Sequence, residues 1–150
     1  MRLDGKTAFV TGAASGIGKR IAQVYAQAGA AIAVADFHPQ AAEAAALELR
    51  ASGARAIAVT VDVTDEAAVD AAVARTVAEL GGLDVLVSNA GIQIVAPLVD
   101  FSFADWKKLL AVHLDGAFLT SRAAMRHMAA SGRGGSMIFM GSSIRRKPGC

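Results

Sequence analysis

The stretch TGAASGIG, residues 11–18, joins two apolar segments of different character. Before it, TAFVTG (7–12) is a short apolar run of strand length. After it, GKRIAQVYAQAG (18–29) carries its apolar side chains at helical spacing. The turn between them contains three glycines: Gly12, Gly16 and Gly18. Glycines allow a tight turn and leave the backbone open, and the first turn of the following helix offers free N–H groups, so this stretch predicts a phosphate-binding turn.

A P-loop is the alternative interpretation of this turn, and its spacing does not fit. Lys19 follows Gly18 as a P-loop would require, but Ala13 stands where the first glycine is needed. Arg20 also replaces the Ser or Thr that would hold magnesium. Glycine trios are common in turns without a ligand, so it is the position between a strand and a helix that favours dinucleotide binding.

Asp36 is the second signal, at the end of the next apolar run, AAIAVAD (30–36). A carboxylate at this place can accept hydrogen bonds from the ribose hydroxyls of adenosine, and it would repel a 2′-phosphate. An aspartate at a strand end is common by itself. Together with the glycine turn it predicts NAD rather than NADP as the cofactor.

Strand-like and helix-like segments alternate along the whole chain. The expected strands are 7–12, 30–36, 54–63, 83–91 and 136–141, and the expected helices are 18–29, 39–53, 64–82, with Thr64 or Asp65 as N-cap, and about 106–130. This alternation indicates right-handed βαβ units and a parallel sheet covered on both faces. We therefore predict an α/β fold with a doubly wound parallel sheet, a Rossmann domain over residues 1–142 that is incomplete and ends after its fifth strand. Ligands of such sheets bind beyond the carboxyl ends of the strands.

Composition indicates a protein without membrane segments. The 150 residues are 54% hydrophobic, but the longest uncharged runs contain polar residues or proline and fall short of a spanning helix. The N-terminus carries Asp4 and several glycines, unlike a signal peptide. We expect a cytoplasmic protein that does not bind membranes.

Charge, cysteine content and side-chain spacing argue against three further classes of protein. The formal net charge is +2, and residues 145–147 supply three of the cations, so the rest of the chain is near neutral and no nucleic-acid partner is expected. The only cysteine, Cys150, can form no internal disulfide. The histidines His38, His113 and His127 stand far apart in sequence, and we expect no metal site.

Three motifs occur in order: TGAASGIG at 11–18, DVTD at 62–65 and SNAG at 88–91. Together they resemble the fingerprints of the short-chain dehydrogenase/reductase family, and the resemblance extends to about Ser142. It implies an NAD-dependent oxidoreductase in which Ser142 is the catalytic serine that hydrogen-bonds the substrate oxygen. The residues expected to bind the cofactor are Gly12, Ser15, Gly16, Ile17, Gly18, Asp36, Asp62, Val63, Asn89, Ala90 and Gly91.

Residues 89–128 are similar to one branch of this family, the D-3-hydroxybutyrate dehydrogenases. That similarity implies oxidation of a small hydroxy acid, D-3-hydroxybutyrate, to acetoacetate. In that branch Gln93 would help to hold the substrate carboxylate. The alternative for Gln93 is an exposed loop amide without a ligand. His113 stands where most relatives have an asparagine that shapes a proton-relay water site, and it is either a relay residue of the catalytic machinery or a packing residue. We interpret Trp106, Phe118, Met125 and Met128 as packing residues.

Two other functions stay open at this point. The chain could derive from a short-chain dehydrogenase that acts on a sugar or polyol, or it could be a non-catalytic NAD-binding module. The family resemblance also implies that the parent protein is a homotetramer.

The catalytic tyrosine and lysine of the family, spaced Tyr-x-x-x-Lys, do not occur in these 150 residues. The only tyrosine, Tyr25, has Gly29 four positions later and is expected to be a packing residue. The end of the chain, SIRRKPGC (143–150), can be encoded by codons that read VHSSEAGL, a pattern like that of the family, in a neighbouring frame. We therefore expect an aberrant, frameshifted tail at 143–150 and no activity from this chain alone.

Overall fold

A parallel sheet forms the middle layer of the molecule. The computed structural model describes residues 2–141. Within them lie five strands in the spatial order β3-β2-β1-β4-β5, all paired in parallel. They are β1 (Thr7–Thr11), β2 (Ala31–Asp36), β3 (Ala56–Thr60), β4 (Val85–Ser88) and β5 (Ser136–Phe139). The chain runs outward from β1 to β3 and then crosses to β4 on the other side of β1. This reversal of strand order confirms the predicted doubly wound Rossmann fold.

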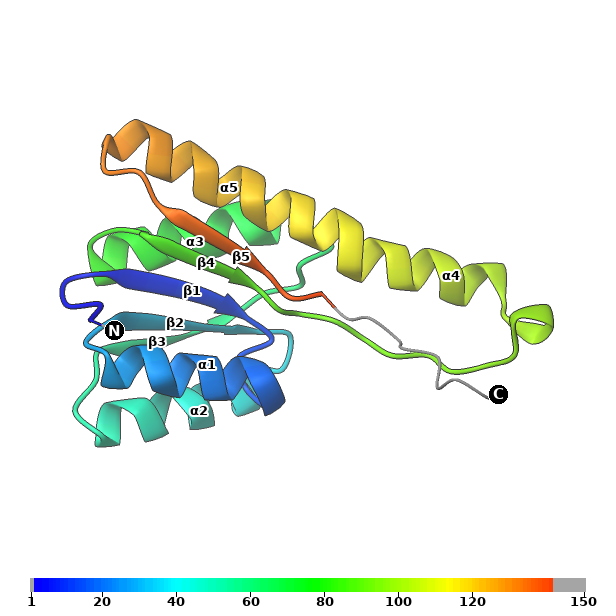
Figure 1. Cartoon of the computed structure of the whole chain (residues 1–150), viewed down its shortest axis with the longest axis horizontal. Coiled ribbons are helices and arrows are strands. Elements are labelled where there is room, and N and C mark those ends of the chain that lie inside the picture. Colours follow the sequence, from blue (N-terminus) through cyan, green and yellow to red (C-terminus); the bar gives the residue numbers. More distant parts are fainter. Residues whose placement is uncertain (1, 142–150) are drawn as a thin grey trace, which may run out of the picture.

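Helices cover both faces of this sheet, with α1 and α2 on one side and α3 and α5 on the other (Figure 1). The helical segments are α1 (Gly16–Gln27), α2 (Pro39–Ala51), α3 (Glu66–Leu80), the 3-10 helix η1 (Leu98–Asp100), α4 (Phe103–Leu110), the π-helical turn η2 (Ala111–Asp115) and α5 (Gly116–Ser131). Asp65 is the N-cap of α3, because its carboxylate accepts a hydrogen bond of 2.9 Å from the Ala68 amide. Gly81 and Gly132, both left-handed, follow the ends of α3 and α5.

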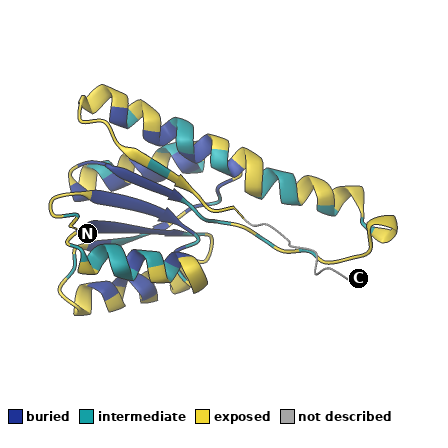
Figure 2. Ribbon diagram, viewed as in Figure 1, coloured by how far each residue is buried: buried dark blue, intermediate teal, exposed yellow. Residues whose placement is uncertain are grey.

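The two layers of helices enclose two apolar cores. Successive residues of β1 point to opposite faces, so Phe9 lies in the core beside α3 and α5 while Val10 lies in the core beside α1 and α2. Burial is concentrated in the central strands and on the helix faces turned toward them (Figure 2). Because each central strand is covered on both sides, its sequence is a continuous apolar run. Tyr25 packs against the second core, as expected.

The helix predicted for residues 106–130 begins earlier and is less regular than expected. It starts at Phe103, where the Ser102 hydroxyl accepts a hydrogen bond of 3.0 Å from the Asp105 amide. The π turn η2 then separates α4 from α5. Such turns insert one extra residue into the helix and shift the side chains that follow, and apolar spacing alone does not reveal them.

The expectation that Trp106, Phe118 and Met125 pack inside the protein is wrong. Their exposed fractions are 49%, 60% and 54%, whereas Met128 is buried as expected. Trp106 lies in α4, and Phe118 and Met125 lie in α5; Figure 2 shows many exposed residues along these two helices. The Phe118 ring is instead partly covered by the guanidinium of Arg122, whose central carbon lies 5.3 Å from the ring centroid.

A buried carboxylate joins β1 to β4 at the edge of the sheet where the strands begin. Asp84 is 6% exposed and accepts hydrogen bonds from the Thr7 amide at 2.9 Å and from the Lys6 ammonium at 3.2 Å. Burial by itself raises the pKa of Asp84, but the hydrogen bonds from Thr7 and Lys6 and the positive charges of Lys6 and Arg133 outweigh it and leave the pKa below its ordinary value.

Two further features of residues 2–141 bear on the predicted class of protein. None of their helices combines the length and the apolar character that crossing a bilayer requires. They also contain no group of three histidine, cysteine or acidic side chains close enough to hold a metal ion.

Candidate functional site

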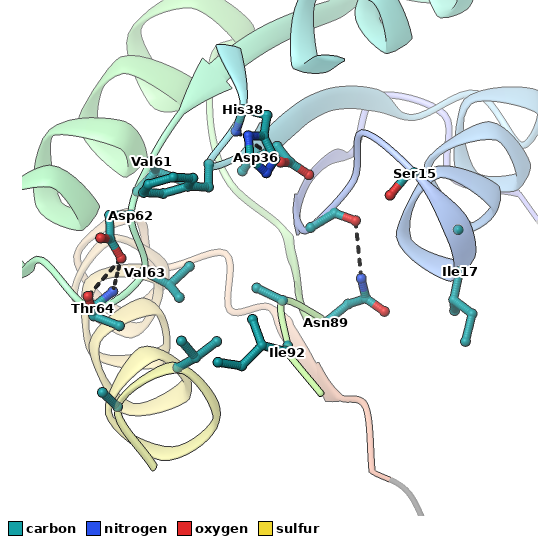
Figure 3. Close-up of a pocket in the computed structure, with 18 of the residues that line it drawn as sticks. Ser15, Ile17, Asp36, His38, Val61, Asp62, Val63, Thr64, Asn89 and Ile92 are labelled. Carbon is teal, nitrogen blue, oxygen red and sulfur yellow. Dashed lines mark hydrogen bonds between the residues drawn. The ribbon is translucent and has the colours of Figure 1, made fainter. Parts of the chain in front are cut away.

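A cleft of about 830 Å³ opens where β1, β2, β3 and β4 end. This size suits a nucleotide-sized ligand, and its place is the one where ligands bind in doubly wound sheets. Ser15 and Ile17 lie at one end, Asp62, Val63 and Thr64 at the other, and Asn89 and Ile92 between them (Figure 3). The lining residues are Gly12, Ser15, Gly16, Ile17, Ala35, Asp36, Phe37, His38, Val61, Asp62, Val63, Thr64, Asn89, Ala90, Gly91, Ile92, Lys108, Ala111 and Val112.

The glycine turn shapes one end of this cleft. Gly12 and Gly16 have φ angles of 63° and 55°, in the left-handed region that favours glycine. Ser15 is the N-cap of α1, and its side chain makes no capping hydrogen bond, so the amides of the first turn of α1 face the cleft without a side-chain acceptor. These amides and the helix dipole suit a pyrophosphate group.

Gly18 differs from the other predicted cofactor residues because it does not line the cleft. A Cβ atom at this position would lie 2.2 Å from the Gly12 carbonyl oxygen and 2.5 Å from Nδ2 of Asn89. Both contacts are far too short, so Gly18 lets α1 approach the turn and the end of β4. Gly18 therefore serves the packing behind the cleft.

Thr11 and Asn89 connect the glycine turn to the segment after β4. The buried Thr11 hydroxyl accepts hydrogen bonds from the Asn89 and Ala90 amides, both at 2.9 Å. In return Nδ2 of Asn89 donates to the Thr11 carbonyl at 3.0 Å. It also donates to the Gly12 carbonyl at 3.3 Å (Figure 3). The motif SNAG therefore holds two walls of the cleft at a set distance from each other.

Asp36 presents its carboxylate to the cleft from the end of β2. One oxygen accepts a hydrogen bond from the Ala14 amide at 3.0 Å and the other accepts from the His38 amide at 3.1 Å. These bonds orient the group, and each oxygen keeps a further lone pair. The oriented carboxylate can therefore accept hydrogen bonds from a diol in the cleft.

The motif DVTD forms the opposite end of the cleft. One Asp62 oxygen accepts from the Thr64 amide at 2.9 Å and from the Thr64 hydroxyl at 2.7 Å, which turns the chain from β3 into α3. Val63 contributes an apolar surface. Behind it, a Cβ on Gly116 would lie 2.7 Å from Cγ2 of Val63, so the glycine at the start of α5 allows the helix to contact this wall.

Besides Gly18, two predicted site residues among residues 2–141 are not part of the lining. His113 lies in η2, is exposed, and bonds to the backbone of Ile92. Gln93 is exposed on the segment that follows Ile92. Ser142 lies outside the described residues. The catalytic roles of His113 and Ser142 and the substrate role of Gln93 therefore stay predictions.

Sequence reasoning missed several lining residues. Phe37 and His38 follow Asp36 directly, and Ile92 follows the SNAG motif, so their neighbours in sequence could have indicated them. Lys108, Ala111 and Val112 come from the helix beyond η1, and no local pattern distinguishes them from its other residues. Their place depends on how far that helix extends beyond the carboxyl ends of the strands (Figure 1).

The family model for short chain dehydrogenases matches residues 6–150. The chain belongs to the short-chain dehydrogenase family. It is 42% identical over 147 residues to a sorbitol dehydrogenase from Cereibacter sphaeroides and 44% identical over 141 residues to a D-threitol dehydrogenase from Mycolicibacterium smegmatis. These matches include 98% and 94% of this chain but 56% and 54% of the relatives. The chain thus spans about half the length of the curated relatives it matches.

Solved structures of the family superimpose closely on this fold. A 7α-hydroxysteroid dehydrogenase complexed with NADH and 7-oxo glycochenodeoxycholic acid matches with a TM-score of 0.88 and 35% identity over 94% of this chain and 55% of that one. A gluconate 5-dehydrogenase from Burkholderia cenocepacia complexed with NADP and tartrate matches with a TM-score of 0.86 and 43% identity over 92% of this chain and 54% of that one. The family binds NAD(H) or NADP.

The cleft of this short-chain dehydrogenase fits a nicotinamide dinucleotide. The left-handed glycines leave room beside the open end of α1 for a pyrophosphate, and Asp36 offers acceptors for ribose hydroxyls. Val63, at the DVTD end of the cleft, and Ile92 and Val112 provide apolar surface for a flat base. The cleft therefore contains the donors, acceptors and apolar walls that a dinucleotide requires.

Proposed function

We propose that the protein to which this chain belongs is an NAD-dependent oxidoreductase that acts on a sugar alcohol or another polyol. The observation that carries the cofactor part is the meeting of the glycine turn with the oriented Asp36 carboxylate in one cleft. The bound nicotinamide would supply the hydride acceptor and donor. The residues of this chain bind and orient that cofactor.

The preference for NAD rests on Asp36. A 2′-phosphate in the place of the ribose hydroxyl would bring a second negative group against a carboxylate whose position two backbone amides hold. Phe37 and His38 follow it in sequence, where an arginine or lysine would be needed to balance that charge. The NADP complex of the related gluconate 5-dehydrogenase makes this preference a point to test.

The polyol part of the proposal rests on the relatives. Sorbitol and D-threitol dehydrogenases match almost the whole of this chain, and both are named for sugar alcohols. D-3-hydroxybutyrate is the second candidate, carried by the similarity of residues 89–128 to that branch. The names of the relatives favour the polyol. Gln93, which would hold the carboxylate of D-3-hydroxybutyrate, is exposed and does not line the cleft.

For the 150-residue chain by itself we propose nucleotide binding without turnover. Its one tyrosine, Tyr25, packs against a core on α1 and cannot serve as the general base at the cleft. A non-catalytic NAD-binding module is the alternative for this chain, and it would behave in the same way. A substrate panel on the full-length protein separates the two, because a dehydrogenase would reduce NAD with sorbitol or threitol and a module would not.

We also propose that the whole protein assembles as a homotetramer. Exposed apolar side chains in α4, η2 and α5 support this idea, because Phe103, Leu114 and Phe118 are 75%, 61% and 60% exposed. Large exposed apolar side chains in one part of a fold are typical of association surfaces. Light scattering on the full-length protein tests it, and a monomer would contradict it.

Calorimetric titration of the 150-residue chain with NAD and NADP tests the cofactor proposal. We expect NAD to bind more tightly than NADP. Asp36→Asn should weaken NAD binding roughly 10- to 100-fold, the effect of losing a charged hydrogen bond, and reduce the difference between the two nucleotides. Asp100→Asn, which changes an exposed carboxylate in η1, is the matched control. Equal affinity for NAD and NADP in the unchanged chain would contradict the proposal.

A further inference from the structure

The wall of the cleft between β4 and η1 is held at two places. Its first residues, Asn89 and Ala90, are bonded to the Thr11 hydroxyl. Among residues 2–141, the hydrogen bonds of the next six positions, 91–96, are those that join Ile92 to His113. Among the described residues, the hydrogen bonds to the second half of this wall therefore come from a single side chain of a distant helix.

His113 meets both backbone groups of Ile92 with the same nitrogen. Its Nε2 lies 2.8 Å from the Ile92 carbonyl oxygen and 3.2 Å from the Ile92 amide nitrogen. One ring nitrogen either donates or accepts a hydrogen bond, so the two contacts cannot both be hydrogen bonds at one time. The shorter distance favours the carbonyl, which makes Nε2 the protonated nitrogen and the donor.

The His113 ring also occupies the space that a side chain on Gly91 would need. A Cβ on Gly91 would lie 2.6 Å from Cε1 of His113 and 3.3 Å from its Nδ1. The backbone of Gly91 is not in the left-handed region, so its conformation does not require glycine. The presence of the ring is the reason for a small residue at position 91.

The same part of the helix contacts the opposite wall. Gly116, three residues after His113, lies against Val63 so closely that a Cβ would be 2.7 Å from Cγ2 of Val63. The π turn η2 contains His113 and ends one residue before Gly116. The junction of α4 and α5 thus contacts both the SNAG wall and the DVTD wall of the cleft.

We propose that His113 is a positioning residue that seats Gly91 and Ile92 in the wall of the nucleotide cleft. Its Nε2–H group donates to the Ile92 carbonyl, and its ring fills the space above Gly91. This role differs from a proton relay, because His113 acts through the backbone it holds and does not need to touch a ligand. We call this contact of His113 with Gly91 and Ile92 the clamp. The clamp is independent of the proposed function, whereas its expected effect on NAD affinity rests on that function.

A double-mutant cycle in the 150-residue chain tests the clamp. Gly91→Ala should lower the urea midpoint clearly in the presence of His113, because the new methyl group meets the ring. In the His113→Ala background the same change should lower the midpoint much less. Should His113→Ala fail to fold, His113→Gln serves as the second background, since a flexible side chain can move away from the methyl group. Additive effects of the two changes would overturn the proposal.

The hydrogen bond is tested separately by spectroscopy and by rescue. Nitrogen-15 NMR should show Nε2 of His113 protonated at neutral pH, and His113→Leu should shift the Ile92 carbonyl resonance while His113→Gln, which keeps a donor, should largely restore it. NAD affinity should fall about tenfold in His113→Leu and recover in His113→Gln. A protonated Nδ1 with a bare Nε2 would overturn the proposal. If NAD does not bind at all, the proposed function fails while the cycle and the NMR result still decide the clamp.

Discussion

Replacing Thr11 by valine removes one buried hydroxyl from the centre of the fold without changing its volume much. The Thr11 side chain is 1% exposed, and its oxygen accepts hydrogen bonds of 2.9 Å from both the Asn89 and the Ala90 amides. The same hydroxyl also donates a longer hydrogen bond of 3.4 Å to the Val87 carbonyl. Valine suits a strand at least as well as threonine, so any loss of stability comes from the hydrogen bonds of this hydroxyl. Two amide donors would lose their acceptor, at roughly 1 to 1.5 kcal/mol each, so we expect Thr11→Val to lower the free energy of unfolding by about 2 to 3 kcal/mol.

Urea denaturation of the 150-residue chain measures this difference. Thr76→Val in α3 is the matched control, because Thr76 is equally buried but donates only to the Ala72 carbonyl of its own helix. We expect the control to change stability by less than about 1 kcal/mol. Thr11→Ser keeps the acceptor and should recover most of the loss. If Thr11→Val is no less stable than Thr76→Val, the bonds from Thr11 do not hold the cleft walls together.

Three further predictions concern the packing at Gly18, the carboxylate of Asp84 and the activity of the 150-residue chain. Gly18→Ala should unfold the chain or lower its stability by more than about 2 kcal/mol. Gly141→Ala, whose added Cβ meets no atom of residues 2–141 within 4 Å, should leave the urea midpoint unchanged, and equal midpoints would contradict the packing argument. Because the pKa of Asp84 in the folded protein lies below its ordinary value of 3.8, the stability this group supplies is present above that pH and is lost as the pH falls through the folded pKa. Asp84→Asn should therefore cost most at neutral pH, with the difference from wild type closing in acid, while Asp100→Asn shows no such trend in a pH series of urea titrations. The purified 150-residue chain should reduce no NAD above background with sorbitol, threitol or D-3-hydroxybutyrate, and measurable turnover would show that the general base lies within it.

The layered fold could be predicted because each layer leaves a local pattern in the sequence. A strand such as β2 is covered on both faces and is therefore apolar throughout, and the helix after it begins with Pro39 and is followed by Gly53. The same holds for the polar ends of the strands, where Asp36 and Asn89 interrupt apolar runs. These residues can be identified from sequence, and the structure brings them to one cleft.

The remaining features depend on contacts between distant segments. Nothing near His113 in sequence indicates that its ring lies over Gly91, because the π turn that directs it is invisible to apolar spacing. Phe118 looks like a core residue on a helical wheel, yet its side chain is 60% exposed and only the Arg122 guanidinium is stacked on its ring within the described residues. Lys108 lines the cleft although it lies in α4, which extends beyond the carboxyl ends of the strands (Figure 1).

The central place of β1 also governs the order in which the chain can fold. The bond from Ala14 to Asp36 closes a loop of 22 positions, whereas the bond from Asn89 to Thr11 closes one of 78. Closing a longer loop costs more chain entropy, so β1, β2 and β3 can associate while β4 is still unfolded. Pulsed hydrogen exchange should then protect β2 amides before those of Asn89 and Ala90. During synthesis, the ribose end of the cleft would form before its second wall exists, and a dinucleotide could be captured only after β4 has arrived.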